Sequence, residues 1–173
     1  MESTNKQQPA TTAITAGRDD SGSLAPSLTP SSTWTSSGLE ESHRQATAIH
    51  ETKNYSRYAN PTVESFEKAI AELENTQAAL AFGSGMGAIS SVFSLLPIGA
   101  VIVASHHGYQ GTTTLLKQMH EDGRLTVKFV DLADTDATLA QIPGCQMLYL
   151  ESPINPGLEI VDLPKLITAA KAA

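Results

Sequence analysis

The sequence has little that would bind nucleic acid or a membrane. Its 18 acidic residues outnumber its 11 Lys and Arg, the formal net charge is −7 at pH 7, and no basic stripe is present. Nucleic acid and anionic membranes are therefore poor candidates as main partners. No apolar run is long enough to cross a bilayer, and the first forty residues contain no stretch resembling a secretory signal. We expect a soluble, cytoplasmic protein.

Cysteine and metal-ligand patterns are also nearly missing. The single cysteine, Cys145, excludes an internal disulfide and fits a reducing compartment. Because Cys145 lies beside a predicted strand, we expect it in the core and not as a nucleophile. The five histidines lack metal-binding spacing, and the one adjacent pair, His106 and His107, is expected to be polar loop surface. We therefore assign no metal.

The chain changes character near residue 60. Residues 1–59 include a Ser/Thr/Pro-rich stretch, SGSLAPSLTPSSTWTSSG, without helical or strand periodicity, which predicts an extended arm with a flexible start. Residues 60–75 instead carry apolar residues at helical spacing behind Pro61, with Thr62 as a plausible N-cap. The apolar residues of this predicted helix are Val63, Phe66, Ile70 and Leu73. The sequence thus predicts an arm over 1–59 and a domain over 60–173.

Short apolar runs alternate with helical segments in the rest of the chain. The runs are AALAF (78–82), AVIVAS (100–105), LTVKFVD (125–131) and QMLYLES (146–152). Unalternated strands between helices are typical of a parallel sheet covered on both faces, so the predicted class is α/β. The final segment, LPKLITAAKAA, is predicted to be the helix that covers the fourth strand. Because such a helix normally leads to another strand, we expect a fragment of a longer protein.

A glycine-rich turn follows the first predicted strand. Gly83, Gly85 and Gly87 would present backbone N–H groups and a helix N-terminus to an anion, usually phosphate, and Ser84 adds a hydroxyl donor. Alternatively, the glycines only allow a tight turn and close helix packing. The turn lacks the Lys-Ser or Lys-Thr pair of a P-loop and the glycine positions of a nucleophile elbow. Gly83, Gly85 and Ala88 match a dinucleotide fingerprint, but the next strand does not end near the required acid.

Three other segments carry polar or aromatic residues suited to a ligand. Tyr55 and Arg57 could bind a phosphate, or they could belong to an ordinary surface loop. Tyr109, after the second predicted strand, could stack on a planar ring or simply pack half-buried. Glu151 and Asn155 follow the fourth predicted strand, at the end where α/β proteins bind ligands, although turn and capping residues also occur there.

In this order, four segments resemble the Cys/Met-metabolism family of pyridoxal-phosphate (PLP) enzymes. The segments are YSRYANPT (55–62), FGSGMGAI (82–89), GYQGTT (108–113) and YLESPINP (149–156). The family includes cystathionine γ-synthase, cystathionine γ-lyase, methionine γ-lyase and O-acetylhomoserine sulfhydrylase. The resemblance implies the N-terminal part of a fold-type I, aspartate-aminotransferase-like enzyme with PLP as its cofactor. It also implies a sulfur-containing or O-acylated amino-acid substrate and, for the intact protein, a homotetramer built as a dimer of dimers.

The resemblance further implies a set of cofactor-binding residues. They are Tyr55, Ser56, Arg57, Ser84, Gly85, Met86, Tyr109, Glu151 and Asn155. The segment 55–57 matches the part that reaches the cofactor phosphate of a neighbouring subunit, and 84–86 matches the turn that holds the phosphate within one subunit. Tyr109 matches the tyrosine that stacks on the pyridine ring and assists proton movements, so it is the expected catalytic residue. Asn155 matches a residue near the cofactor's phenolic oxygen.

Two residues that the family requires have no match before Ala173. These are the acid that pairs with the pyridine nitrogen and the Schiff-base lysine, and neither Lys165 nor Lys171 matches the lysine position. We therefore expect the chain alone to be inactive. Either it is the N-terminal part of a PLP-dependent lyase or transferase, or it is a non-catalytic remnant that binds cofactor or pairs with a full-length subunit.

The reaction within the family stays open. Methionine γ-lyases typically carry a cysteine two residues after the stacking tyrosine, and this chain has Gly111 there, which argues against that activity. Cystathionine synthesis, cystathionine cleavage and sulfhydrylation all remain compatible with the sequence. The common expectation is transsulfuration chemistry on a homoserine- or cysteine-derived amino acid.

Overall fold

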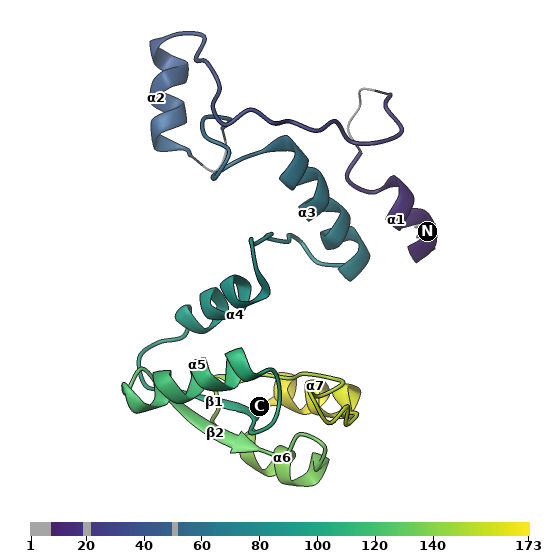
Figure 1. Ribbon diagram of the computed structural model, residues 1–173, viewed down its shortest axis with the longest axis vertical. Helices are drawn as coiled ribbons and strands as arrows, with labels where there is room; N and C mark the ends of the chain where they lie inside the picture. The colour runs from purple at the N-terminus through teal and green to yellow at the C-terminus, as the bar shows by residue number, and fades with distance from the viewer. Residues whose placement is uncertain (1–7, 19–21, 50–51) are drawn as a thin grey trace. The chain divides into compact units, whose positions relative to one another are not determined.

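The structure, a computed structural model, describes residues 8–18, 22–49 and 52–173. It divides into two compact units, residues 1–81 and 82–173, and each is described by itself (Figure 1). The start of the arm, predicted to be flexible, includes residues 1–7, which lie outside the described residues. The predicted domain boundary between residues 59 and 60 stays a prediction.

The first unit contains two helices within the segment predicted as an extended arm, so that prediction is wrong for these residues. Helix α1 (Pro9–Thr15) begins with proline, which is favourable at the first helical position because its missing N–H is not needed there. Helix α2 (Leu39–Thr47) has Glu40 and Glu41 in its first turn and Arg44 in its last. These charges complement the helix dipole, and they were the signal in the sequence for α2.

The helix predicted over 60–75 is present as α3 (Pro61–Glu74), but its cap differs from the prediction. Asn60 is the N-cap, and its side-chain oxygen accepts a hydrogen bond from the Thr62 N–H at 2.9 Å. Asparagine suits this position because its short side chain reaches the first-turn amides. Three apolar residues of this helix are exposed in the described chain, namely Val63, Phe66 and Leu73.

The second unit is built on a parallel sheet of three strands in the order β2–β1–β3. The strands are β1 (Ala100–Ser105), β2 (Leu125–Val130) and β3 (Met147–Leu148). Ala100 pairs with Leu125, and Ile102 pairs with Met147. Four helices complete the unit: α4 (Gly85–Ser94), α5 (Gln110–Glu121), α6 (Thr135–Gln141) and α7 (Leu163–Ala172). The predicted α/β class is confirmed.

Two predicted strands differ from the structure. Residues 78–82, predicted as the first strand, form no strand. Leu80, at the centre of that segment, stays 78% exposed. The strand predicted over 146–152 is reduced to β3, although the Tyr149 N–H still donates to Val103 O at 2.9 Å.

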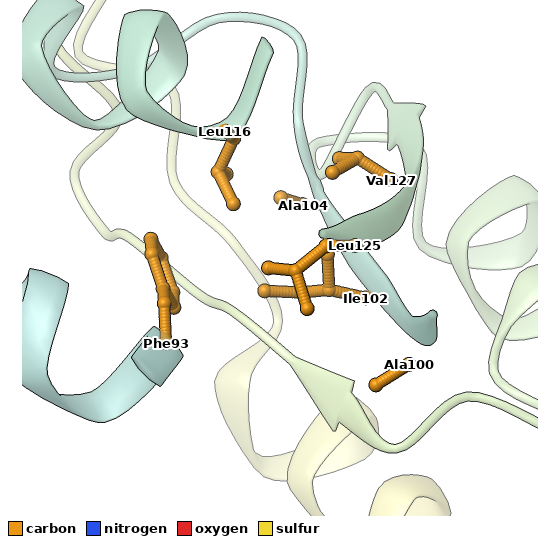
Figure 2. Packing of buried hydrophobic residues seen from close by; sticks show 7 residues of the cluster. All are labelled: Phe93, Ala100, Ile102, Ala104, Leu116, Leu125 and Val127. Carbon is orange, nitrogen blue, oxygen red and sulfur yellow. The ribbon is translucent and has the colours of Figure 1, made fainter. Parts of the chain in front are cut away.

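Hydrophobic clusters lie on both faces of the sheet. The first contains Phe93 of α4 and Leu116 of α5 with residues of β1 and β2, as Figure 2 shows. The second contains residues near α6 and α7: Leu132, Ile142, Ile154, Val161 and Leu166. Met147 packs against the first cluster and Leu148 against the second. Because successive side chains of a strand point to opposite faces, the predicted sheet covered on both faces is present.

Candidate functional site

The glycine-rich turn ends in the N-terminus of α4. Ser84 is the N-cap residue, and its Oγ accepts the Gly87 N–H at 3.0 Å. The N–H groups of Gly85 and Met86 find no acceptor in the described part of the chain, as expected for first-turn amides. The Ser84 hydroxyl uses a lone pair in its cap, so its proton is still free to donate. The turn thus presents three donors at the positive end of a helix dipole.

At two positions of this turn, the fold of the second unit does not require glycine. Gly83 and Gly85 lie outside the left-handed region, and a Cβ added to either would meet no atom within 4 Å. A Cβ at Gly87 would lie 3.2 Å from Ser84 Oγ, so crowding accounts for Gly87 alone. The open space at the other two lets another molecule approach the backbone closely.

Tyr109 lies at the start of α5, next to the turn that precedes α4. Its ring covers Gly111, where an added Cβ would lie 2.6 Å from Tyr109 Cε1 and 3.1 Å from Met86 Sδ. The Thr112 hydroxyl is also 4.0 Å from Met86 Sδ. Tyr109 is 47% exposed. Met86 therefore lies between the glycine-rich turn and Gly111, which the half-exposed Tyr109 ring covers.

Glu151 joins the segment after β1 to the segment after β3. Its Oε1 and Oε2 accept the Tyr109 backbone N–H at 3.2 and 3.1 Å, and Oε1 also accepts the Asn155 N–H at 3.1 Å. The carboxyl ends of parallel strands meet at one edge of a sheet, which explains why these two segments are neighbours. The six predicted site residues of the second unit thus form one connected group.

The remaining predicted site residues, Tyr55, Ser56 and Arg57, form a local group in the first unit. Tyr55 pairs with Thr33 in an isolated antiparallel bridge, and the Ser56 N–H donates to Ser32 O at 2.9 Å. Arg57 Nη2 lies 3.4 Å from the Tyr55 hydroxyl, and its guanidinium carbon lies 5.3 Å from the Tyr55 ring centroid. Arg57 is exposed and takes part in neither ion pair found among the described residues. Its charge is therefore available to an anion.

The two glycines around Tyr109 were not assigned to the site by sequence reasoning. Gly111 was noted only for its difference from methionine γ-lyases, and Gly108 was not assigned at all. Gly108 has φ +139°, and a Cβ there would lie 3.2 Å from Glu151 Oε2. The sequence pattern that could have indicated their role is a pair of glycines, one immediately before the tyrosine and one two residues after it.

Other features of the described residues lie outside this site. A cavity of about 550 Å³ is lined by residues of α1 and of the C-terminal end of α3, and by none of the predicted site residues. Within the described ranges, no three His, Cys, Asp or Glu side chains gather as metal ligands would. None of the helices there is both long and apolar enough to cross a membrane. Cys145 is partly buried and packs against the second hydrophobic cluster.

Comparison of the chain with known proteins identifies a family to which it is similar. A family model described as Cys/Met metabolism PLP-dependent enzyme matches residues 10–173. Cystathionine β-lyase from Coxiella burnetii is 35% identical over 130 residues, which cover 74% of this chain and 34% of that protein. Cystathionine γ-synthase from Escherichia coli is 34% identical over 175 residues, covering 97% of this chain and 42% of that protein.

A solved structure gives the same result. Cystathionine γ-lyase from Lactobacillus plantarum, complexed with L-serine, has a TM-score of 0.80 and 31% sequence identity. The match covers 96% of this chain and 42% of that one, so the chain spans less than half of each of these three proteins. The predicted resemblance and the predicted fold, part of a fold-type I enzyme, are confirmed. The chain belongs to the Cys/Met-metabolism family of PLP-dependent enzymes.

Proposed function

We propose that this chain is the cofactor-phosphate-binding part of a PLP-dependent transsulfuration enzyme of the cystathionine γ-synthase or γ-lyase type. The substrate of the whole enzyme is then a homoserine- or cysteine-derived amino acid. The observation that carries the proposal is the turn at residues 83–86, where free amides and the Ser84 hydroxyl lie beside an exposed tyrosine ring. A cytoplasmic location and a homotetramer belong to the same proposal.

The donors of the site fit a phosphate dianion. The amides of Gly85 and Met86 and the Ser84 hydroxyl can each donate one hydrogen bond, and the helix dipole favours negative charge there. Gly83 and Gly85 leave open space in front of this backbone, as a close phosphate contact requires. Arg57 and the Tyr55 hydroxyl of the first unit supply a charged and a neutral donor, contributed in the assembled enzyme to a neighbouring subunit's cofactor.

The remaining residues fit the ring of the cofactor. When bound, PLP supplies an electron sink for carbanion chemistry at an amino-acid substrate. Tyr109, which is 47% exposed, would stack on that ring, and its hydroxyl would exchange protons with the substrate. Asn155, whose backbone N–H binds Glu151 on the loop after β3, would donate its side-chain amide to the ring's phenolic oxygen.

We further propose that the chain alone does not catalyse the reaction. Lys165 lies on α7 and pairs with Asp136 at 3.1 Å, and Lys171 lies in the last turn of the same helix. Neither lysine belongs to the group formed by the glycine-rich turn, Tyr109 and Glu151. Purified chain is therefore expected to release no product from cystathionine or O-acetylhomoserine. Turnover of either compound above the rate without protein would contradict this part of the proposal.

The test of cofactor binding uses pyridoxamine 5′-phosphate, because its amine cannot react with surface lysines as the PLP aldehyde can. Isothermal titration of the full chain should detect binding of pyridoxamine 5′-phosphate and much weaker binding of pyridoxamine, which lacks the phosphate. In the intact, assembled enzyme, where Arg57 reaches the neighbouring subunit's cofactor, Arg57→Ala should weaken the binding by about 30-fold, the equivalent of ~2 kcal/mol for a lost charged hydrogen-bond pair. Equal binding of both compounds would refute a phosphate site.

Arg44→Ala is the matched control for Arg57→Ala. Arg44 is also an exposed arginine of the first unit, but it already pairs with Glu41 within α2. Removing it should leave the dissociation constant unchanged. If the two variants weaken binding equally, the effect reflects general charge, and Arg57 does not belong to the site.

A further inference from the structure

We propose that Glu151 is a positioning residue that caps α5 from a distant loop and thereby fixes both Tyr109 and Asn155. The sequence placed Glu151 among residues that bind the cofactor directly. In the structure, both of its carboxylate oxygens accept backbone N–H groups of the protein. The inference rests on the proposed function only where it assigns Tyr109 and Asn155 to the cofactor, and the contact itself can be measured without cofactor.

The first argument is the missing local cap of α5. Tyr109 is the N-cap residue, and its side chain makes no capping hydrogen bond. In a capping box, a Glu or Gln at the third helical position accepts the N–H of the N-cap residue. That position is Thr112 here, and the carboxylate that accepts the Tyr109 N–H comes from Glu151, 42 residues later. A negative charge at a helix N-terminus is also favoured by the dipole.

The second argument is the backbone of Gly108, which is independent of the hydrogen bonds. Its φ of +139° is one that residues with side chains rarely adopt. A Cβ at Gly108 would in addition lie 3.2 Å from Glu151 Oε2 and 3.7 Å from Cδ. The glycine therefore lets the carboxylate approach the chain immediately before Tyr109.

The third argument is what the same carboxylate does to the loop after β3. Glu151 Oε1 accepts the Asn155 N–H at 3.1 Å. The preceding residue, Ile154, is 1% exposed and belongs to the second hydrophobic cluster. Asn155 itself is exposed, so its position depends on the backbone and not on packing of its side chain. One charged acceptor therefore sets the start of α5 and the Asn155 backbone relative to each other.

Hydrogen exchange of individual amides, measured by NMR on the full chain without cofactor, tests this arrangement. Glu151→Ala should accelerate exchange at the Tyr109 and Asn155 amides by at least about tenfold, because both lose a charged acceptor. Glu151→Gln keeps one acceptor oxygen and should give an intermediate rate. Amides of β1, such as Val103, should keep their rates. Glu121→Gln, at the other end of α5 and exposed, is the control and should change neither amide.

Pyridoxamine 5′-phosphate affinity supplies the second measurement. Glu151→Ala should weaken its binding, and Glu151→Gln should restore part of it. Unchanged exchange at Tyr109 and Asn155 would overturn the proposal, and so would equal acceleration at Val103, which would mean general destabilisation. Accelerated exchange with unchanged affinity would overturn the positioning role. If the wild-type chain binds no pyridoxamine 5′-phosphate but shows the selective exchange effect, the proposed function fails and the cap of α5 stands.

Discussion

Replacing Gly111 by alanine is predicted to weaken cofactor binding without lowering the free energy of unfolding. An added Cβ would lie 2.6 Å from Tyr109 Cε1 and 3.2 Å from Cζ. Carbon atoms in contact lie about 3.5–4.0 Å apart, so the ring must move by roughly 1 Å or rotate away. Tyr109 is 47% exposed, so its ring can move without disturbing the core. The variant should therefore fold normally with a displaced ring.

The two expected magnitudes follow from this displacement. Alanine is favoured over glycine in a helix by about 0.5–1 kcal/mol, and Gly111 lies within α5, so the free energy of unfolding should stay equal or rise by up to about 1 kcal/mol. A well-placed aromatic stacking contact contributes about 0.5–1.5 kcal/mol beyond burial. Its loss should weaken pyridoxamine 5′-phosphate binding by about two- to tenfold.

A double-mutant cycle decides whether the effect passes through the ring. Urea unfolding gives the stability, and isothermal titration gives the affinity, for Gly111→Ala, Tyr109→Ala and the double variant. If alanine acts by displacing the ring, it should not weaken binding further once the ring is gone. Thr114→Ala, on an exposed position of the same helix, is the control. Equal losses from Gly111→Ala with and without Tyr109 would refute the reasoning.

Two further predictions concern the turn and the core. Ser84→Ala removes the hydrogen bond to the Gly87 N–H and should lower the free energy of unfolding by about 1 kcal/mol in urea, while also weakening binding of pyridoxamine 5′-phosphate. Ser84→Asp would keep the cap but repel the phosphate. This variant should therefore keep its free energy of unfolding and lose its binding of pyridoxamine 5′-phosphate. Phe93→Ala leaves a cavity at a fully buried position beside Tyr149 and should lower the free energy of unfolding by about 3–5 kcal/mol. A loss below 1 kcal/mol would mean that the first cluster does not stabilise the second unit.

The parts of the fold that the sequence predicted correctly are governed by local patterns. The β1 run is almost continuously apolar, the β2 run carries Leu, Val and Phe at alternate positions, and both strands occur where predicted. The segment 78–82 is also apolar, yet it forms no strand, because strand formation depends on pairing with a partner as well as on composition. Likewise α2 was missed because its signal is charge placement over nine residues and not an apolar stripe.

The candidate site also has parts that local sequence patterns predicted and parts that they could not predict. Ser84 and Gly85 could be proposed from the sequence because a turn before a helix is a local pattern with a known consequence for its amides, whereas Met86 was indicated only by the resemblance to the family. The partnership of Glu151 with Tyr109 could not be predicted from spacing, since 42 residues separate them and only the sheet brings them together. The resemblance to the family indicated both residues without indicating that one holds the other.

The contacts of the second unit imply that the phosphate end and the ring end of the site are not independent. Met86 supplies an amide to the glycine-rich turn, and its sulfur lies against the position of Gly111, beneath the Tyr109 ring. The Tyr109 amide in turn is held by Glu151, which also holds Asn155. Tyr109 and Asn155 are thus held by one shared carboxylate, and Met86 links the glycine-rich turn to the helix position that the Tyr109 ring covers. A substitution at the phosphate end should therefore change the contacts at the ring end, and the reverse. The binding free energies measured for single substitutions should not simply add.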